Sequence, residues 1–226
     1  MSQPADFGRY DRKLEFILRT SARVFAEKGF HSTSMRDIAR ETRVSLAGLY
    51  YYCESKDELL FLIQDNCFGR VLARLEERLK GVSDPVEKFR VVVDNHLSFF
   101  AANMAEMKVL SHEAESLGGE MYGRVAAKKQ QYTRTVRRIL GEARQRRGAD
   151  ARGVDLTVAT YALFGMMNWI YNWYDPRGKL AVSELVESVS RLFLEGFLHA
   201  ESGADSQSPA KARGAERPSV WRESAT

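Results

Sequence analysis

The sequence predicts an all-α protein of two helical units. Apolar residues recur at helical spacing from Leu14 onward, capping residues precede most of these runs, and strand-like alternation of apolar and polar residues is scarce. Hydrophobic residues make up 44% and charged residues 28% of the 226 positions, which is typical of a globular chain. This length allows a small domain packed beside a larger one.

Three helices and a long connecting helix are expected in the first 80 residues. Their boundaries follow from residues that cap or break helices. In chain order, Gly29 ends the first helix, Ser34 and Asp37 open a short second helix, Thr42 and Arg43 interrupt it, Ser45 caps a third helix through Tyr52, and Ser55 with Glu58 caps a fourth helix to Leu79.

A second unit is expected after Gly81, which breaks the helical pattern. Its predicted helices are 85–102, 104–116, 120–147, 156–174 and 183–198, the first of them capped by Asp84 before Pro85. The resulting organisation is a flexible N-terminus at 1–9, a three-helix domain at 10–55, a connecting helix at 56–80, a helical domain at 81–199 and a tail at 200–226. The tail is predicted to be disordered because its composition cannot bury enough apolar surface.

Residues 34–52 have the pattern of a helix-turn-helix, whose second helix keeps one face buried and offers the other to a DNA major groove. At helical spacing, one side of this second helix carries Leu49, Tyr52 and Cys53, and the other carries Leu46, Ala47, Tyr50 and Tyr51. Small side chains at Ala47 and Gly48 allow a close approach to the groove. A lone tyrosine here would more often pack between helices, but three in a row cannot all face one core.

The motifs F-A-E-K-G-F-H-S-T-S-M-R-D-I-A and V-S-L-A-G-L-Y-Y-Y-C-E-S-K-D-E-L-L resemble the signature of the TetR family of transcriptional regulators over residues 10–62. The resemblance implies a repressor that binds a palindromic double-stranded operator as a homodimer and is released by a small-molecule effector. It also implies DNA contacts: Thr33 and Ser34 on phosphates, Ser45, Leu46, Ala47 and Tyr51 on bases, and Tyr50 and Lys56 on the backbone.

Two positions depart from the family pattern. Arg43 stands where the turn usually has glycine, and Leu46 stands where lysine is frequent. If Arg43 adopts the left-handed conformation, its side chain costs about 1 kcal/mol, which a guanidinium–phosphate contact would offset. Leu46 cannot neutralise a phosphate, so we expect it to make apolar contact with thymine. We also expect operator binding to depend less on salt than it would with lysine at this position.

The stretch between Asp155 and Asp175 carries no formal charge and is nearly long enough to span a membrane. Asn168 and Asn172 near one end, together with the lack of a second such stretch, favour a helix buried in a dimer. TetR-like proteins pair their last two long helices across a twofold axis, and residues 82–199 resemble that plan in length and order.

The phrase N-W-I-Y-N-W-Y-D-P-R-G-K-L resembles a branch of the family that senses acyl-coenzyme A thioesters from fatty-acid, aromatic or steroid breakdown. Such an effector would place its acyl chain in an apolar tunnel. The candidate effector-binding residues of this kind are Phe99, Phe100, Met104, Met107, Met166, Met167, Asn168, Trp169 and Trp173. The alternative for any one aromatic or methionine is ordinary core packing.

Residues 124–152 contain ten lysines and arginines against two acids. Arg124, Lys128 and Arg134 in this stretch are candidates for binding the phosphates of coenzyme A through charge-assisted hydrogen bonds. A solvated helix face explains the same charges equally well. The net charge of +4 suits nucleic acid or an anionic ligand but does not decide between them.

Other classes of function have little support. His112-Glu113 lacks the second histidine of a helical zinc site, no phosphate-loop or serine-nucleophile motif occurs, and Cys53 and Cys67 match neither a redox pair nor a zinc pattern. We therefore expect no enzyme, metal site or cofactor, and no membrane partner. The start of the chain has no apolar signal segment, which predicts a cytoplasmic protein.

Three alternatives stay open. An enzyme of a type that these motifs do not reveal would have to turn over an acyl thioester. A regulator of drug efflux would bind lipophilic cations through acidic or aromatic residues such as Glu113, Glu115 and Trp169. A helical interaction module that never reads DNA would be unaffected by replacing Tyr51 or Arg43.

Overall fold

The computed structural model describes residues 4–113, 115–146 and 154–198, and these ranges contain helices and no strand. The all-α class predicted from the sequence is confirmed. The elements are α1 (Pro4–Lys28), α2 (Met35–Thr42), α3 (Leu46–Tyr50), α4 (Lys56–Leu79), α5 (Pro85–Ala101), α6 (Met104–His112), α7 (Gly119–Arg146), α8 (Leu156–Asn168), the 3-10 helix η1 (Trp169–Asn172) and α9 (Val182–Leu198).

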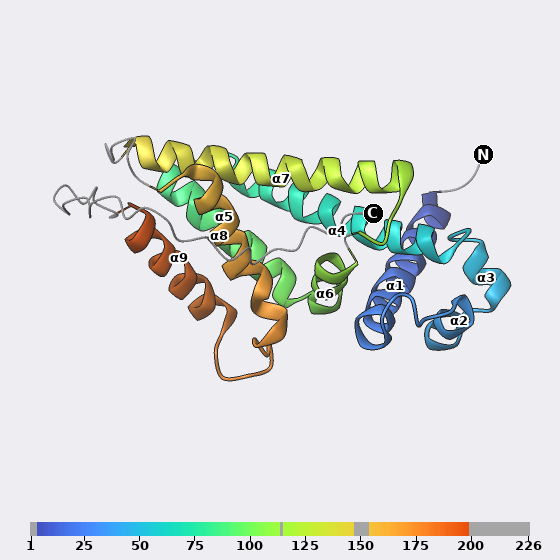
Figure 1. Ribbon diagram of the computed structural model, residues 1–226. Coiled ribbons are helices and arrows are strands. Elements are labelled where there is room, and N and C mark those ends of the chain that lie inside the picture. Colours follow the sequence, from blue (N-terminus) through green and yellow to red (C-terminus); the bar gives the residue numbers. More distant parts are fainter. Residues whose placement is uncertain (1–3, 114, 147–153, 199–226) are drawn as a thin grey trace, which may run out of the picture.

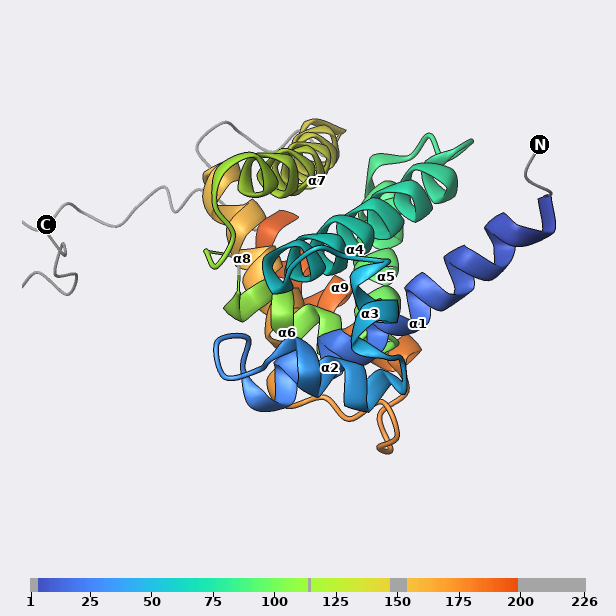
Figure 2. The same ribbon diagram turned by 90° about the vertical axis from the view of Figure 1, so that its right-hand side faces the viewer.

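Helices α1, α2 and α3 form a separate head at one end of the molecule, and α8 and α9 lie at the other end (Figure 1). The predicted capping box of α2 is present: the Ser34 hydroxyl accepts from the Asp37 N–H, and the Asp37 carboxylate accepts from the Ser34 N–H. Viewed toward the head, α2 and α3 lie at the front of the molecule (Figure 2). Local capping thus sets the start of the second helix.

Four elements differ from the sequence prediction by more than one residue. Helix α6, expected at 104–116, ends at His112. Helix α1 begins at Pro4, within the 1–9 stretch expected to be flexible, and α3 ends at Tyr50 rather than Tyr52. The expected helix 156–174 is α8 followed by the short η1, because the chain tightens into a 3-10 turn after Asn168. The predicted tail at 200–226 lies outside the described residues.

The larger domain is a bundle in which α4 and α7 run alongside each other and α5 packs on α7 and α9 (Figure 1). Its core draws on α4, α5, α7, α8, η1 and α9, with Phe89, Val92 and Leu140 fully buried. None of the described helices has the length and apolarity needed to cross a membrane.

The core of the head extends into the larger domain. Val109 of α6, Leu117 in the connection between α6 and α7, and Val125 of α7 are buried in the same cluster as Ile17 and Leu49. Helix α1 also packs against α6. A shift of α6 or α7 would therefore disturb packing beneath the helix-turn-helix.

Candidate DNA interface and effector domain

The short helix α3 has the two-sided character that its sequence predicts. Leu49 and Cys53 are buried, whereas Tyr50 is 46% and Tyr51 is 73% exposed, and Ala47 faces solvent. Tyr52 is half-buried and stacks on Tyr10 of α1 with 5.0 Å between ring centroids. The three consecutive tyrosines thus divide their roles: Tyr52 packs against the head, and its two predecessors remain available to a groove.

Gly48 allows the turn into α3 to be tight. The side-chain oxygen of Ser45 caps α3 by accepting from the Gly48 N–H, with 3.0 Å between Oγ and N. A Cβ atom on Gly48 would come within 3.0 Å of both the Ser45 Oγ and the Val44 Cγ1. The absence of a side chain therefore serves the cap itself, in addition to the close approach to DNA expected from the sequence.

Arg43 has the left-handed conformation that the sequence left conditional, with φ 50° and ψ 37°. Its N–H caps the end of α2, and its side chain is exposed. Arg36 of α2 is also exposed. In the described chain neither guanidinium has a hydrogen-bond or ion-pair partner. Sequence reasoning missed Arg36, although its place two residues after the Ser34 cap was a usable signal.

The hydroxyls predicted to bind phosphate are already engaged within the head. Thr33 is 2% exposed and its hydroxyl donates to the Gly29 carbonyl oxygen at 2.8 Å, so this side chain does not reach the surface. The exposed Ser34 hydroxyl donates to the Asp37 carboxylate. Hydrogen bonds from Ser34 and then Arg40 hold the pKa of Asp37 well below its usual value. The Thr33 hydroxyl is thus used inside the head, and its phosphate contact stays a prediction that would require this hydrogen bond to break.

Lys56 also has a structural role that sequence reasoning missed. Its Nζ donates to the carbonyl oxygens of Phe30 at 2.8 Å, His31 at 3.3 Å and Thr33 at 2.9 Å, and it lies 4.5 Å from the centre of the Phe30 ring. An ammonium group has three donors, so all of them are used within the turn between α1 and α2. The predicted phosphate contact of Lys56 would require this turn to open.

One face of α8 and η1 is exposed and apolar. Val158, Tyr161, Trp169 and Trp173 are between 55% and 62% exposed, and Met166 is 36% exposed. Val158, Tyr161 and Met166 lie on α8, Trp169 begins η1 and Trp173 follows it, and we call these five residues the stripe. Leu192 of α9, 65% exposed, is a further large apolar side chain at this end of the molecule. A surface of this kind marks an interaction site.

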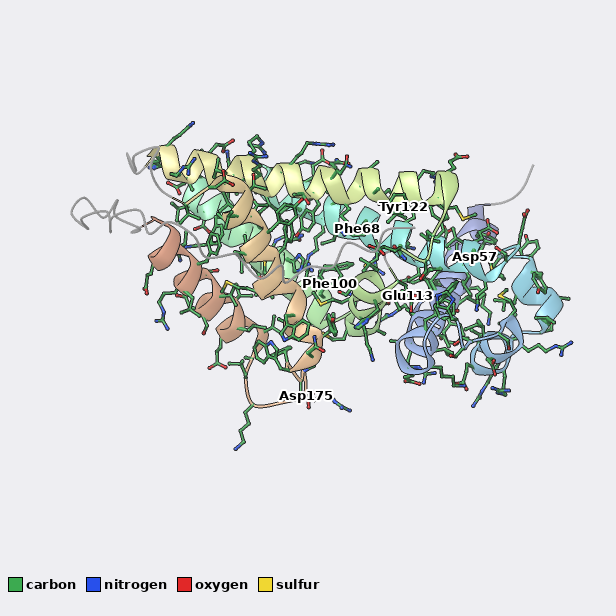
Figure 3. The ribbon with its side chains drawn as sticks, in the orientation of Figure 1. Asp57, Phe68, Phe100, Glu113, Tyr122 and Asp175 are labelled. Carbon is green, nitrogen blue, oxygen red and sulfur yellow. The ribbon has the colours of Figure 1, made fainter. Side chains whose placement is uncertain are left out.

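The predicted effector residues therefore do not gather around one tunnel. Phe99, Phe100 and Met107 are almost completely buried in the core, and so is Met167. Met104 is partly buried against the same core, whereas Met166, Asn168, Trp169 and Trp173 face outward. Figure 3 shows Phe100 inside the bundle, near the junction of α5 and α6. The effector assignments stay predictions, and binding there would require the core to open.

The predicted coenzyme A residues on α7 make contacts with α4. Lys128 pairs with Asp65, with 2.7 Å between Nζ and Oδ1, and also donates to the Asp65 carbonyl oxygen. The guanidinium of Arg124 lies 4.7 Å from the centre of the Phe61 ring, and Arg134 is exposed. Two of the three cations thus help to join α7 to α4, which supports the structural alternative for them without testing the predicted ligand contact.

A chain of polar groups is buried in the core between α5, α7 and α8. The Asn95 amide donates to the Val71 carbonyl oxygen, and the Tyr132 hydroxyl lies 3.2 Å from the Nδ1 of His96. Asn95 is fully buried, and His96 and Tyr132 are 2% and 3% exposed. Burial lowers the pKa of His96 to about 3, and a hydrogen bond with the Asn168 side chain opposes this shift more weakly. The imidazole is consequently neutral at pH 7.

We predict that His96 makes the protein unstable to mild acid. The unfolded chain has the ordinary histidine pKa near 6.5, so between about pH 6.5 and pH 3 the unfolded state binds more protons than the folded state. Stability should fall by about 2–3 kcal/mol from pH 6.5 to pH 4.5, and His96→Phe should remove most of that loss. Urea unfolding at several pH values measures this loss of stability in the wild type and in the variant. His112→Phe, at an exposed histidine, is the control and should keep the wild-type profile.

The end of α6 is joined to the head by hydrogen bonds. The Gln64 amide of α4 donates to the Glu113 carbonyl oxygen at 2.9 Å, and the Glu113 carboxylate accepts from the Phe30 N–H at 3.4 Å. Figure 3 shows Glu113 where α6 faces α1. This carboxylate also accepts from Ser116, so it is not free to bind the lipophilic cation considered in the sequence analysis.

Two hollows lie next to the α1–α6 contact. One, of about 20 Å³, is lined by residues that include Arg70, Phe99 and Glu106; the other, of about 140 Å³, lies beside Gly29, Lys108 and His112. Both are smaller than the 300–1,000 Å³ of usual ligand pockets.

An exposed recognition surface on a small helical head, followed by a helical domain with an apolar outer face, is the arrangement of a DNA-binding regulator. Residues 17–63 match the family model for bacterial regulatory proteins of the tetR family, and residues 82–197, about half of the chain, match the tetracyclin repressor-like C-terminal domain. The chain belongs to the TetR family of transcriptional regulators, and it is a regulator rather than an enzyme.

Relatives of known name agree with this membership. The fatty acid metabolism regulator protein of Bacillus subtilis is 25% identical over 182 residues, which cover 80% of this chain and 93% of that protein. The solved structure of AibR with isovaleryl coenzyme A and operator DNA is 28% identical, with a TM-score of 0.71 and coverage of 80% and 97%. A TetR-family regulator from Bordetella parapertussis is 29% identical, with a TM-score of 0.74 and coverage of 82% and 95%.

Proposed function

We propose that this protein is a repressor that binds a palindromic operator as a homodimer and is released from it by an acyl-coenzyme A thioester. The observation that carries the DNA-binding part is the exposed Tyr50–Tyr51 face of α3, held by a buried Leu49 and flanked by unpaired Arg36 and Arg43. A twofold dimer would hold two such helices one DNA turn, roughly 34 Å, apart.

The stripe on α8 and η1 supports the homodimer. Apolar side chains exposed along one helix face are costly in water and are covered when the same face of a second copy packs against them. Pairing at this end of the molecule leaves the two heads free at the other end (Figure 1).

In the bound complex, Ala47, Tyr50 and Tyr51 face the groove, with Leu46 and Gly48 at its border. Ser45 lies at the start of the same helix and is exposed, but its oxygen caps α3. The main phosphate anchors are Arg36 and Arg43, whose guanidinium groups are unpaired in the described part of the free protein. This assignment places the charged contacts at the edges of an apolar and aromatic reading surface.

Arg43→Gly should strengthen the fold and weaken operator binding at once. Glycine adopts the left-handed conformation without strain, so the variant should gain about 0.5–1 kcal/mol of stability. Loss of the phosphate contact should lower the slope of log affinity against log salt by about 0.9 per protomer. Chemical unfolding and fluorescence anisotropy at several salt concentrations give both quantities.

Arg90→Ala removes an equal charge from an exposed position on α5, away from the head, and serves as the control. Its salt slope should stay close to that of the wild type. A full wild-type slope in Arg43→Gly would remove Arg43 from the set of DNA contacts.

The acyl thioester is supported by similarity. The chain resembles AibR, whose structure contains isovaleryl coenzyme A, and a relative named as a regulator of fatty acid metabolism. The domain corresponding to the AibR effector domain has a large aromatic core here, with Phe89, Phe100 and Phe164 among its members. Opening that core would give an acyl chain an apolar environment.

Release from DNA would depend on a change in the contact between α6 and the head. A ligand that displaces α5 or α6 would move Glu113, which is hydrogen-bonded both to Gln64 of α4 and to Phe30 beside α2. A coupling free energy of about 1–3 kcal/mol gives a 5- to 150-fold loss of operator affinity. The ligand must prefer the arrangement that does not fit DNA.

Gel-shift titration with a series of acyl-coenzyme A thioesters on the DNA upstream of the protein's own gene tests this function. Release by one or more thioesters, but not by free coenzyme A, is the expected result. If none of the series releases the protein, the effector assignment fails while DNA binding stands. If the protein does not shift that DNA at all, the choice of operator is wrong.

A further inference from the structure

Tyr10 of α1 contacts two of the three consecutive tyrosines at the end of α3. Its ring stacks on that of Tyr52, with 5.0 Å between centroids and 27° between the planes, and it meets the Tyr51 ring edge-on at 6.0 Å and 79°. Tyr51 and Tyr52 also contact each other, at 5.2 Å and 90°. These three rings, which we call the tyrosine triad, join the first helix to the reading surface.

The side chain of Tyr51 has few contacts besides those of the triad. Tyr51 caps the C-terminal end of α3 and is 73% exposed. In the described part of the chain, the rings of Tyr10 and Tyr52 are its only aromatic contacts, and its hydroxyl makes no hydrogen bond. An exposed side chain without contacts changes rotamer rapidly, so these two rings determine where Tyr51 points.

Tyr10 is the member of the triad that is held from outside the helix-turn-helix. Tyr52 follows Tyr51 directly in the same turn, so it offers no independent support. Tyr10 lies roughly two helical turns after Pro4, inside α1. The buried residues Ile17 and Leu18 anchor this helix in the core of the head. A ring carried by an anchored helix gives Tyr51 a fixed surface to rest against.

The triad is joined by its rings rather than by its hydroxyl groups. None of its three phenols has a hydrogen-bond partner among the described residues. Burial raises the pKa of Tyr10, and the phenols of Tyr51 and Tyr52 raise it further, so Tyr10 is neutral at pH 7. Edge-to-face contact is favourable because the positive edge of one ring meets the negative face of the other. Phenylalanine at position 10 would keep these contacts.

We propose that Tyr10 is a positioning residue for DNA recognition, which holds the Tyr51 ring in the orientation that enters the major groove. The proposal rests on the proposed function, in which Tyr51 contacts bases, and it adds a residue outside the helix-turn-helix to the recognition apparatus. A ring that is already oriented loses less rotamer freedom when it binds. The edge contact leaves most of Tyr51 uncovered, so the ring is oriented and still available to DNA.

Two competing explanations for Tyr10 make different predictions. If its hydroxyl bound DNA directly, replacement by phenylalanine would weaken operator binding. If its stack on Tyr52 only stabilised the head, removing its ring would weaken binding equally whether or not Tyr51 is present. Positioning through Tyr51 predicts neither result.

The test is a double-mutant cycle on operator binding, measured by fluorescence anisotropy with the full-length protein. The operator is a duplex that the wild type selects from random-sequence DNA. Tyr10→Met keeps a long apolar side chain beside Tyr52 but has no ring, and it should weaken binding by the dimer about tenfold. In the Tyr51→Ala background, the same replacement should change affinity by less than about twofold, because the ring that Tyr10 positions is gone.

Two single variants complete the cycle. Tyr10→Phe should bind as the wild type does. Phe16→Met removes a 46% exposed ring from the same helix outside the triad, and as the control it should also leave binding unchanged. Circular dichroism and urea unfolding check that each variant is folded, and Tyr10→Leu takes the place of Tyr10→Met if the methionine variant does not fold.

Wild-type affinity in Tyr10→Met overturns the proposal. So does a tenfold loss that persists in the Tyr51→Ala background, which leaves only the structural role, and so does an equal loss in Tyr10→Phe, which assigns a direct hydroxyl contact. If Tyr51→Ala binds the operator as the wild type does, the base contact of Tyr51 in the proposed function fails, and this inference fails with it. If the wild type selects no duplex, DNA binding itself is overturned.

Discussion

Glutamate in place of Tyr161 should convert the protein to a monomer and weaken operator binding by about 100-fold or more. Tyr161 is 62% exposed near the middle of the stripe formed with Val158, Met166 and Trp169. In a twofold interface the substitution occurs on both copies, so each dimer would bury two unpaired carboxylates of the same sign. A monomer contacts one half-site, and it loses the gain that comes from linking two binding events.

Analytical ultracentrifugation and fluorescence anisotropy with the operator measure the two effects of Tyr161→Glu. Tyr122→Glu is the matched control, because Tyr122 is a 50% exposed tyrosine at the start of α7, outside the α8 stripe. The control should remain dimeric. A dimeric Tyr161→Glu with wild-type operator affinity would move the interface to another face.

Replacing Lys56 by methionine should destabilise the fold by about 2 kcal/mol and weaken operator binding. The carbonyl oxygens of Phe30, His31 and Thr33 lose a charged donor, and the turn that orients α2 relative to α1 loses the group that holds it together. Thermal or urea unfolding measures the first effect, with a lower melting temperature by roughly 4–8 °C. Methionine has a similar length, so the loss of packing is small.

The salt dependence of operator binding separates a structural Lys56 from one that contacts phosphate. A structural role predicts weaker binding with an unchanged slope, whereas a phosphate contact predicts a slope smaller by about 0.9 per protomer. Lys129→Met, at an exposed lysine of α7, is the control and should leave stability within about 0.5 kcal/mol of wild type. A stable Lys56→Met variant would contradict the assigned role.

Features that depend on neighbours in the chain could be predicted from the sequence. The caps at Ser34, Ser45 and Asp84 are present because a capping side chain bonds to N–H groups only two or three residues away. The buried and exposed sides of α3 were also predictable, since helical periodicity fixes which residues share a face. The left-handed conformation of Arg43 stayed conditional at the level of the sequence, and the structure shows it with φ 50°.

The partners of Lys56 and Thr33 could not be predicted in this way. Lys56 bonds to carbonyls 23 to 26 residues earlier, so its role exists only after α4 has packed against α1 and the turn that follows α1. A long flexible side chain carries no sequence signal that separates a phosphate contact from a bond inside the protein. The same applies to Lys128, which the fold pairs with Asp65.

The candidate effector residues show most clearly that burial could not be predicted from the sequence. Phe100 and Trp169 are both aromatic and both on helices, yet one is 3% and the other 60% exposed. Their side chains have similar hydrophobicity, and which of them enters the core depends on how α5, α8 and η1 rotate against the rest of the bundle. In the sequence, His96 looks like an isolated packing residue. Its contacts to Tyr132 and Phe164 become visible only in the folded protein.

By itself, the sequence determined the all-α class, the order of the helices, the two-sided recognition helix and, through its motifs, membership in the TetR family. Those properties come from local hydrogen bonds and helical periodicity, which act over a few residues. Only the tertiary structure decided which cations remain free for DNA, which aromatic residues fill the core, and which polar groups are buried. These depend on contacts between segments far apart in the chain, because burial and pairing are properties of the packed molecule.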